Sequence, residues 1–176
     1  MNPMTRAAAL LLALTLACAA FANGAAQVTT VILVRHAEKA TEPAADPPLT
    51  DAGQLRANEL ARVLGSAGID TIYTTTFART RGTAAPLAVA LKVTPVEIKP
   101  GPTFAADIAA KILAEHKGTT VLVVGHSNTT QQVIKSLGIA DAPKIEESTF
   151  DNLFIVTIAE GSEPRLTALR YGAVAR

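Results

Sequence analysis

Residues Val28–Val34 read VTTVILV, and this stretch decides the fold of the chain. It is rich in β-branched side chains and nearly all apolar, which is typical of a strand buried on both faces of a sheet. A second stretch of the same kind, Thr119–Val124 (TTVLVV), follows much later. Helical and strand patterns alternate around the two. This alternation predicts an α/β fold, a three-layer α/β/α sandwich with a central, mostly parallel (mixed) sheet.

The other elements are predicted from the spacing of apolar residues. Helical spacing occurs at 57–64, 78–91, 105–112 and 130–137, and short strand patterns occur at 70–74 and 94–98. We expect Gly82 and Pro86 to interrupt the second of these helices, because both residues disfavour a helix interior. Leu153–Ala159 and Arg165–Tyr171 read as two strands of a hairpin that turns around Gly161.

The first 22 residues have the pattern of a secretory signal peptide. Met1–Arg6 carries one positive charge, Ala7–Ala20 is apolar, and small residues lead up to Ala22. This predicts export to the periplasm or the outside of the cell, with cleavage after Ala22, or after Ala26 as the second choice. The apolar run is too short for a stable membrane span, which needs roughly 20 residues. Lipidation of Cys18 is the less favoured alternative.

Residues 23–176 then form a single domain, long enough to bury its own core. The chain has 16 basic and 15 acidic residues, and Arg6 is the only charged residue in the signal peptide, so the remaining domain is neutral. A neutral domain has no electrostatic footprint for nucleic acid or for an anionic membrane. Cys18 is the only cysteine, so the domain has no disulfide, no cysteine nucleophile and no thiolate ligand for a metal.

Polar clusters follow three of the predicted strands. They are Arg35–Lys39 (RHAEK), Thr74–Thr80 (TTTFART) and Gly125–Thr129 (GHSNT). Ligands of open α/β sheets lie beyond the carboxyl ends of the strands, so we expect these clusters to meet. Two of the chain's three histidines, His36 and His126, would then lie with two arginines at one edge of the sheet.

This combination of residue types points to a phosphoryl group. The guanidinium groups of Arg35 and Arg79 can each bind two phosphate oxygens. A histidine such as His36 can act as a nucleophile or a proton carrier. Ser127, Asn128 and Thr129 precede a helical pattern, where free backbone N–H groups favour an anion. Two arginines oppose a cation, so we expect no metal and no cofactor at this site.

Four stretches, in this order, resemble the histidine phosphatase superfamily, which includes the cofactor-dependent phosphoglycerate mutases. They are Arg35–Glu38 (RHAE), Leu49–Gly53 (LTDAG), Tyr73–Ala84 with Arg79-Thr80 and Thr83-Ala84, and Val121–Ser127 (VLVVGHS). Thr75 stands where the family usually has serine. The resemblance extends from about residue 31 to residue 137 and implies a phosphoglycerate mutase-like fold.

The resemblance implies a role for each site residue. His36 would attack phosphorus and carry the phosphoryl group, with His126 as the second catalytic histidine. Arg35, Arg79 and Ser127 would bind the phosphate oxygens. The implied activity is metal-independent hydrolysis of phosphomonoesters or phosphoramidates through a phosphohistidine. The substrate is expected to be a small phosphorylated compound or a phosphoprotein.

The sequence departs from the family in one respect, because no clear proton-donating acid follows the third strand. The candidates for a proton donor after Ile98 are Asp107, Glu146, Glu147 and Asp151. Glu146 and Glu147 read as a solvated loop, with lining of the site mouth as the alternative. The missing acid keeps a non-catalytic phosphate-binding or sensor module open and disfavours a mutase-type phosphotransferase. An esterase with Ser127 as nucleophile is disfavoured because Thr129 stands where its sharp turn needs glycine.

Overall fold

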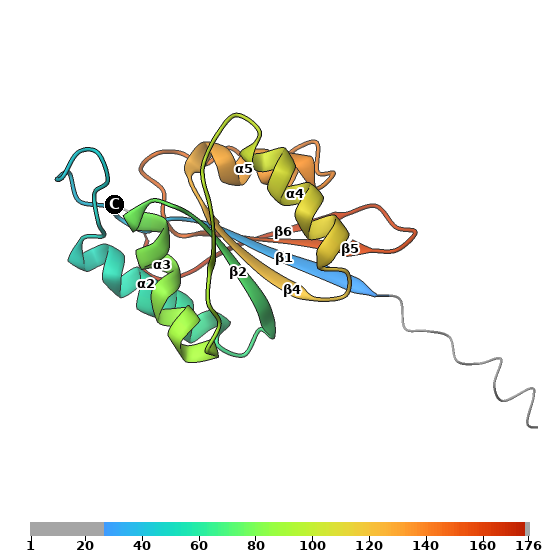
Figure 1. Cartoon of the computed structure of the whole chain (residues 1–176), viewed down its shortest axis with the longest axis horizontal. Coiled ribbons are helices and arrows are strands. Elements are labelled where there is room, and N and C mark those ends of the chain that lie inside the picture. The colour runs from blue at the N-terminus through green and yellow to red at the C-terminus, as the bar shows by residue number, and fades with distance from the viewer. Residues whose placement is uncertain (1–26, 175–176) are drawn as a thin grey trace, which may run out of the picture.

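The computed structural model describes residues 27–174 of the chain. Its elements in order are β1 (Val28–Arg35), α2 (Asp51–Leu64), β2 (Ile69–Thr75), α3 (Ala78–Leu91), β3 (Val96–Ile98), α4 (Phe104–Glu115), β4 (Thr120–Gly125), α5 (Ser127–Ser136), β5 (Asn152–Ala159) and β6 (Arg165–Arg170) (Figure 1). The predicted signal peptide, its two cleavage sites and Cys18 lie outside the described residues.

One six-stranded sheet forms the centre of the domain, in the order β3-β2-β4-β1-β5-β6. The four strands from β3 to β1 are parallel, whereas β5 runs antiparallel to β1 and β6 antiparallel to β5. In the register of β1 with β4, Val34 pairs with Val124 and Arg35 with Gly125. The mostly parallel, mixed sheet that the alternating pattern predicts is therefore confirmed.

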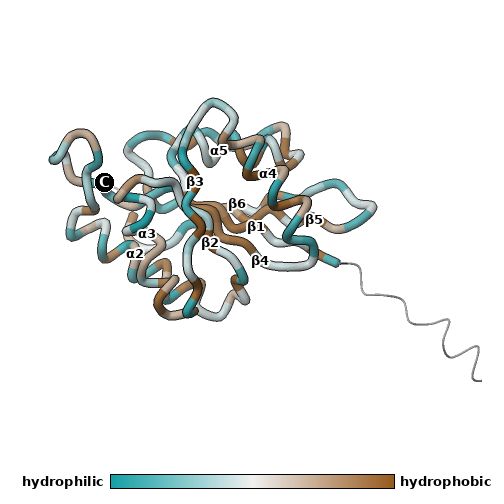
Figure 2. The backbone as a smooth tube through the Cα atoms, viewed as in Figure 1, coloured by the Kyte–Doolittle hydropathy of each residue, from teal (hydrophilic) through white to brown (hydrophobic). Residues whose placement is uncertain are grey.

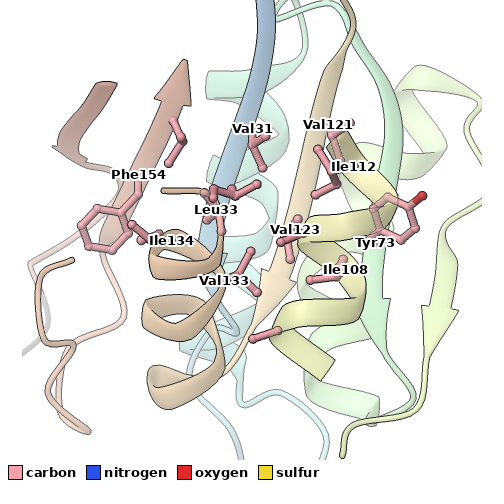
Figure 3. Packing of buried hydrophobic residues seen from close by; sticks show 14 of the residues in the cluster. Val31, Leu33, Tyr73, Ile108, Ile112, Val121, Val123, Val133, Ile134 and Phe154 are labelled. Atoms are coloured by element: carbon pink, nitrogen blue, oxygen red, sulfur yellow. The ribbon is translucent and has the colours of Figure 1, made fainter. Parts of the chain in front are cut away.

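Both faces of the sheet are buried, as the apolar stretches predict. Along β1, Val31 and Leu33 pack on one face, while Ile32 and Val34 pack on the other. Figure 3 shows the first face, where side chains of α4 and α5 meet the strands: Val31, Leu33, Tyr73, Ile108, Ile112, Val121, Val123, Val133, Ile134 and Phe154. On the second face, Leu60 of α2 and Leu87 of α3 cover the sheet.

The hydropathy of the chain follows these layers. The central strands are the most hydrophobic part of the tube, and the helices and loops around them alternate between apolar and polar residues (Figure 2). Burial of both faces accounts for the nearly unbroken apolar runs, since a strand between two helical layers has no solvated side. The three-layer α/β/α architecture is thus built around Val28–Val34, as its composition predicts.

Of two local predictions, one fails in the structure and the other is confirmed. The helix α3 runs unbroken from Ala78 to Leu91 although Pro86 lies inside it, so the predicted interruption is wrong. Its buried residues, among them Thr83, Ala84 and Leu87, hold both halves against the sheet, and this packing outweighs the one hydrogen bond that proline removes. The predicted hairpin is present as β5 and β6, with Gly161 at a φ of 74° between them.

No helix within residues 27–174 has the length and apolar character needed to cross a membrane.

Candidate active site

The candidate site lies where three parallel strands end side by side. β2, β4 and β1 are neighbours in the sheet, so their carboxyl ends share one edge. His36 directly follows β1, and its backbone N–H donates to the carbonyl of Gly125 at the end of β4, at 2.9 Å. His126 follows Gly125, and the centres of the two imidazole rings are 5.4 Å apart. The sheet topology therefore brings the two predicted histidines together.

His36 is held in one tautomer by its own backbone. Its Nδ1 lies 2.8 Å from the carbonyl oxygen of Ala37, which can only accept, so Nδ1 carries the hydrogen. The Nε2 atom then has the free lone pair. The peptide of Ala37 is fixed in turn, because its N–H donates to Thr83 Oγ1 at 2.9 Å, and the Thr83 hydroxyl donates to the carbonyl of Arg79. These bonds fix a neutral imidazole with a free lone pair on Nε2, which is the state that a nucleophilic histidine needs.

His126 is oriented by a row of threonine hydroxyls. Its Nε2 lies 3.1 Å from Thr75 Oγ1, which lies 2.8 Å from Thr80 Oγ1. Thr80 Oγ1 also lies 2.9 Å from the carbonyl oxygen of Phe77. All groups are satisfied when Thr80 donates to that carbonyl, Thr75 donates to Thr80, and His126 Nε2 donates to Thr75. Thr75, which replaces the family's usual serine, therefore supports the second histidine.

Both histidines are kept uncharged in the folded protein. Burial above all, with a smaller contribution from the positive charge of Arg35, lowers the pKa of His36 to about 3. The pKa of His126 is lowered to about 4, mainly by burial and to a smaller extent by the positive charges of Arg79 and Arg35. His36 is only 3% exposed, which is consistent with a strong cost of charging it. At neutral pH its Nε2 is thus available as a nucleophile.

We expect the free energy of unfolding to fall as the pH drops from 6.5 towards 4, because both histidines take up protons only in the unfolded chain. Above the unfolded-state pKa of about 6.5 the histidines are neutral in both states, and stability is unaffected. As the pH falls from there towards the lower pKa of the folded protein, only the unfolded chain takes up protons, and stability is lost. For His36 the slope is about 1.4 kcal/mol per pH unit. Urea unfolding across this window measures it. His36→Gln should lose this part of the slope, and equal slopes for both proteins would contradict the expectation.

Arg79 lies in the first turn of α3, and two neighbours fix its guanidinium. The Cζ atom lies 4.1 Å from the centre of the Phe77 ring, and Nη1 lies 3.9 Å from Asp46 Oδ1. Asp46 also accepts the backbone N–H of Ala78 at 2.8 Å, so its carboxylate anchors the start of α3. Asp46 belongs to a proline-rich loop far from Arg79 in sequence. No spacing or motif in the sequence signals that the loop folds back onto the site.

Arg35 has a second set of partners that its motif does not reveal. Its Nη1 donates to the carbonyls of Glu146, Glu147 and Thr149, at 3.0, 2.7 and 3.2 Å. Its Nη2 donates to Glu147 Oε2 at 2.7 Å. The guanidinium therefore ties down the loop between α5 and β5, in addition to facing the site. Phe150 of the same loop packs on it, with the ring centre 4.3 Å from Cζ.

The two arginines still offer donors to an anion. The Nε atoms of Arg35 and Arg79 are both buried, and neither has a hydrogen-bond partner among residues 27–174. An unpaired buried guanidinium N–H is costly, so an incoming anion that accepts these bonds would be stabilised. This is the strongest sign in the structure that the site binds an oxyanion.

Ser127 and Glu147 lie together at the mouth of the site. Ser127 is the first residue of α5, so the helix starts earlier than its apolar spacing suggests. The Ser127 hydroxyl donates to Glu147 Oε1. Glu147 is thus more than part of a solvated loop, and the alternative that it lines the site is the one the structure shows. Ser127 has a carboxylate, and not an imidazole, as its partner, which weakens the esterase interpretation.

Glu38 connects the segment that carries His36 to helix α2. Arg56 of α2 donates to both of its oxygens, with Nε at 3.1 and 3.0 Å and Nη2 at 2.7 Å from Oε1. The carbonyl of Glu38 also accepts the N–H of Thr50, which caps α2. Gly53 is required here, because a Cβ atom would lie 2.2 Å from the carbonyl oxygen of Glu38. The RHAE and LTDAG stretches are therefore one structural unit.

Two other residues lie outside this chemistry. His116, the third histidine, caps the C-terminal end of α4. Its Nε2 is hydrogen-bonded to the Tyr73 hydroxyl at 2.7 Å. Glu38, engaged by Arg56, is not free to bind a metal. Within residues 27–174 no group of three or more histidine, cysteine or carboxylate side chains is placed to hold a metal ion.

Comparison with known proteins agrees with this geometry. Residues 31–101, which carry three of the four motifs, match the model of the histidine phosphatase superfamily (branch 1). No protein of curated function matches the sequence significantly. Among solved structures, a mycobacterial glucosyl-3-phosphoglycerate phosphatase is similar with a TM-score of 0.67 at 15% identity, over 82% of this chain and 100% of that one.

A second similar structure is the protein histidine phosphatase SixA in complex with tungstate. It has a TM-score of 0.63 at 19% identity, over 80% of this chain and 96% of the other. At such identities the likeness shows a shared fold, and the family model covers the first three of the four motifs but not Val121–Ser127. Residues 31–101 therefore match the histidine phosphatase superfamily, and the described domain shares its fold with solved phosphatases.

Proposed function

We propose that the protein hydrolyses phosphomonoesters or phosphoramidates through a phosphohistidine formed on His36, without a metal ion. One observation carries the proposal. A neutral imidazole with its Nδ1 hydrogen fixed on Ala37 lies beside two buried arginines whose Nε donors lack partners among the described residues. This arrangement combines a nucleophile with charge stabilisation for a phosphoryl group, which are the main needs of phosphoryl transfer.

In the proposed first step, His36 Nε2 attacks phosphorus and the bond from phosphorus to the leaving group breaks. The guanidinium groups of Arg35 and Arg79 hold the phosphate oxygens and stabilise their charge in the transition state. His126, fixed by Thr75, and Ser127 complete the set of groups around the phosphate. In the second step, water attacks phosphorus and the bond from phosphorus to Nε2 breaks, which returns neutral His36 and releases inorganic phosphate.

The substrate that we propose is a small phosphorylated compound or a phosphoprotein. The similar solved structures include a glucosyl-3-phosphoglycerate phosphatase and a protein histidine phosphatase, which supports keeping both kinds of substrate in the proposal. The signal-peptide pattern of residues 1–22 supports export to the periplasm or beyond, with Cys18 lipidation as the alternative. Export favours a small phosphorylated compound over a cytoplasmic signalling protein.

The experiment that tests the proposal is to trap the intermediate. The protein is mixed rapidly with an activated, radiolabelled phosphate donor in the presence of a strong chelator, then denatured. We expect a burst of leaving group and a protein-bound label that survives alkali and is lost in acid, as a phosphoramidate is. Turnover without any such label would overturn the covalent route, and turnover that requires an added metal would overturn metal independence.

A non-catalytic phosphate-binding or sensor module is the second candidate. It is favoured by the commitment of both terminal nitrogens of Arg35 to the loop around Glu147, which leaves fewer donors for a substrate. Such a module would bind inorganic phosphate but would give neither turnover nor label in the trapping experiment.

A further inference from the structure

Glu147 holds two of the groups that are expected to bind phosphate. Arg35 Nη2 donates to its Oε2 at 2.7 Å, and the Ser127 hydroxyl donates to its Oε1. A carboxylate presents two oxygens in a plane, much as two oxygens of a phosphate do, and both anions fit the same guanidinium donors. The Glu147 side chain therefore takes bonds that a bound phosphate could take.

The backbone of Glu147 is anchored, whereas its side chain is free to leave. Three carbonyls of residues 146–149 accept hydrogen bonds from Arg35 Nη1, so the loop stays beside the site. The side chain itself is 79% exposed, so rotating it into water removes little packing. The carboxylate partner of buried Arg35 is largely hydrated even when paired, so an anion that accepts the same bonds can replace it at low cost. The displaced carboxylate would remain within a side-chain length of the phosphate.

We propose that Glu147 is a specificity-determining residue: it occupies the phosphate site of the free protein, gives way to the substrate, and then disfavours leaving groups that carry negative charge. The part that concerns leaving groups rests on the proposed hydrolysis, whereas the competition with phosphate does not. The hydrogen bond from Ser127, followed by the charge of Arg35, lowers the pKa of Glu147, which supports a carboxylate at neutral pH.

The charges around the site mouth support this selectivity. Asp46 lies beside Arg79 at 3.9 Å, so a second carboxylate is present near the other arginine. Lys144 lies on the same loop as Glu147, but Glu146 neutralises it at 2.8 Å. A leaving group that projects from the phosphate towards solvent thus passes close to the carboxylates of Glu147 and Asp46. The positive charges of Arg35 and Arg79 only partly neutralise these carboxylates, because they also interact with the phosphate. Neutral or cationic leaving groups avoid this repulsion, and carboxylate-bearing ones do not.

Binding of inorganic phosphate tests the first half without any need for turnover. Calorimetry compares the wild type with Glu147→Gln, which keeps the shape of the side chain and removes its charge. Glu146→Gln is the matched control, because that neighbouring carboxylate contacts Lys144 and not Arg35 or Ser127. We expect phosphate to bind about tenfold more tightly to Glu147→Gln at low salt, and about equally to wild type and control. Unchanged or weaker binding to Glu147→Gln would overturn the inference.

A pair of aryl phosphates tests the second half. Phenyl phosphate and para-carboxyphenyl phosphate differ by one negative charge on the leaving group. The wild type and Glu146→Gln should prefer phenyl phosphate in kcat/KM, and Glu147→Gln should reduce that preference by about fivefold to tenfold. An unchanged preference would overturn the selectivity. A kcat loss in Glu147→Gln that grows as the leaving group becomes poorer would instead make Glu147 a proton carrier, which also overturns the inference.

The two halves separate this inference from the proposed function. If no protein turns over any aryl phosphate, while Glu147→Gln still binds phosphate more tightly, the hydrolysis proposal fails and the competition stands. If turnover and label are present but phosphate binding does not respond to Glu147, the hydrolysis stands and the role of Glu147 falls.

Discussion

His36→Ala is expected to lower the turnover of an activated aryl phosphate by at least about four orders of magnitude, because it removes the atom that would form the covalent bond. The loss should appear in kcat, since the phosphate-binding arginines remain in place. The alanine variant should also bind inorganic phosphate, because Arg35 and Arg79 keep their partners in the loop around Glu147 and in Asp46. Steady-state kinetics and phosphate calorimetry on the same preparation measure both quantities.

Ser127→Ala is the matched control for that experiment. Ser127 donates to Glu147 and has no bond to either site histidine, so its loss should reduce turnover by no more than about tenfold. The acid-labile label should persist in Ser127→Ala and disappear in His36→Ala. A Ser127→Ala variant without turnover, alongside an active His36→Ala, would reverse the assignment and restore the esterase interpretation.

The fold could be predicted from sequence because the burial of a strand determines which residue types it contains. A strand between two helical layers must be apolar on both faces, and Val28–Val34 and Thr119–Val124 have that composition. Residues that follow parallel neighbouring strands must share an edge, and so His36 and His126 could be expected to meet. Pro86 shows the limit of such rules, because tertiary packing of α3 overrides a local preference that is correct in isolation.

The rest of the site could not be predicted because it depends on loops. Asp46 and Glu147 reach the arginines from segments whose paths no periodicity describes, and their contacts span more than 30 and more than 100 residues of sequence. The second role of Arg35, as the anchor of the loop at Glu146–Thr149, is equally invisible in the RHAE stretch. Motifs indicate which groups meet a substrate, whereas the groups that modulate them are fixed only by the folded chain.

Arg56→Met is expected to lower the free energy of unfolding by about 3 kcal/mol or more, which is the range for removing one partner of a buried ion pair. Arg56 is 5% exposed, and besides Glu38 it donates to the carbonyls of Tyr171 and Ala173. Methionine fills similar space but leaves the Glu38 carboxylate and these carbonyls without donors. The bond network thus joins the segment after β1, helix α2 and the C-terminal segment. Urea unfolding at neutral pH measures the loss.

A double-mutant cycle with Glu38→Gln separates the ion pair from the carbonyl contacts. Burial raises the pKa of Glu38, but the hydrogen bonds from Arg56 outweigh it and leave that pKa below its usual value, so the pair is charged at neutral pH. Glu38→Gln should cost less than Arg56→Met, because Arg56 keeps both carbonyl partners. The double variant should cost less than the sum of the singles, since the charge left unpaired by one change is removed by the other. Strict additivity would show that Arg56 acts through the C-terminal carbonyls alone, and that Glu38 is not the partner that holds the segment behind His36 in place.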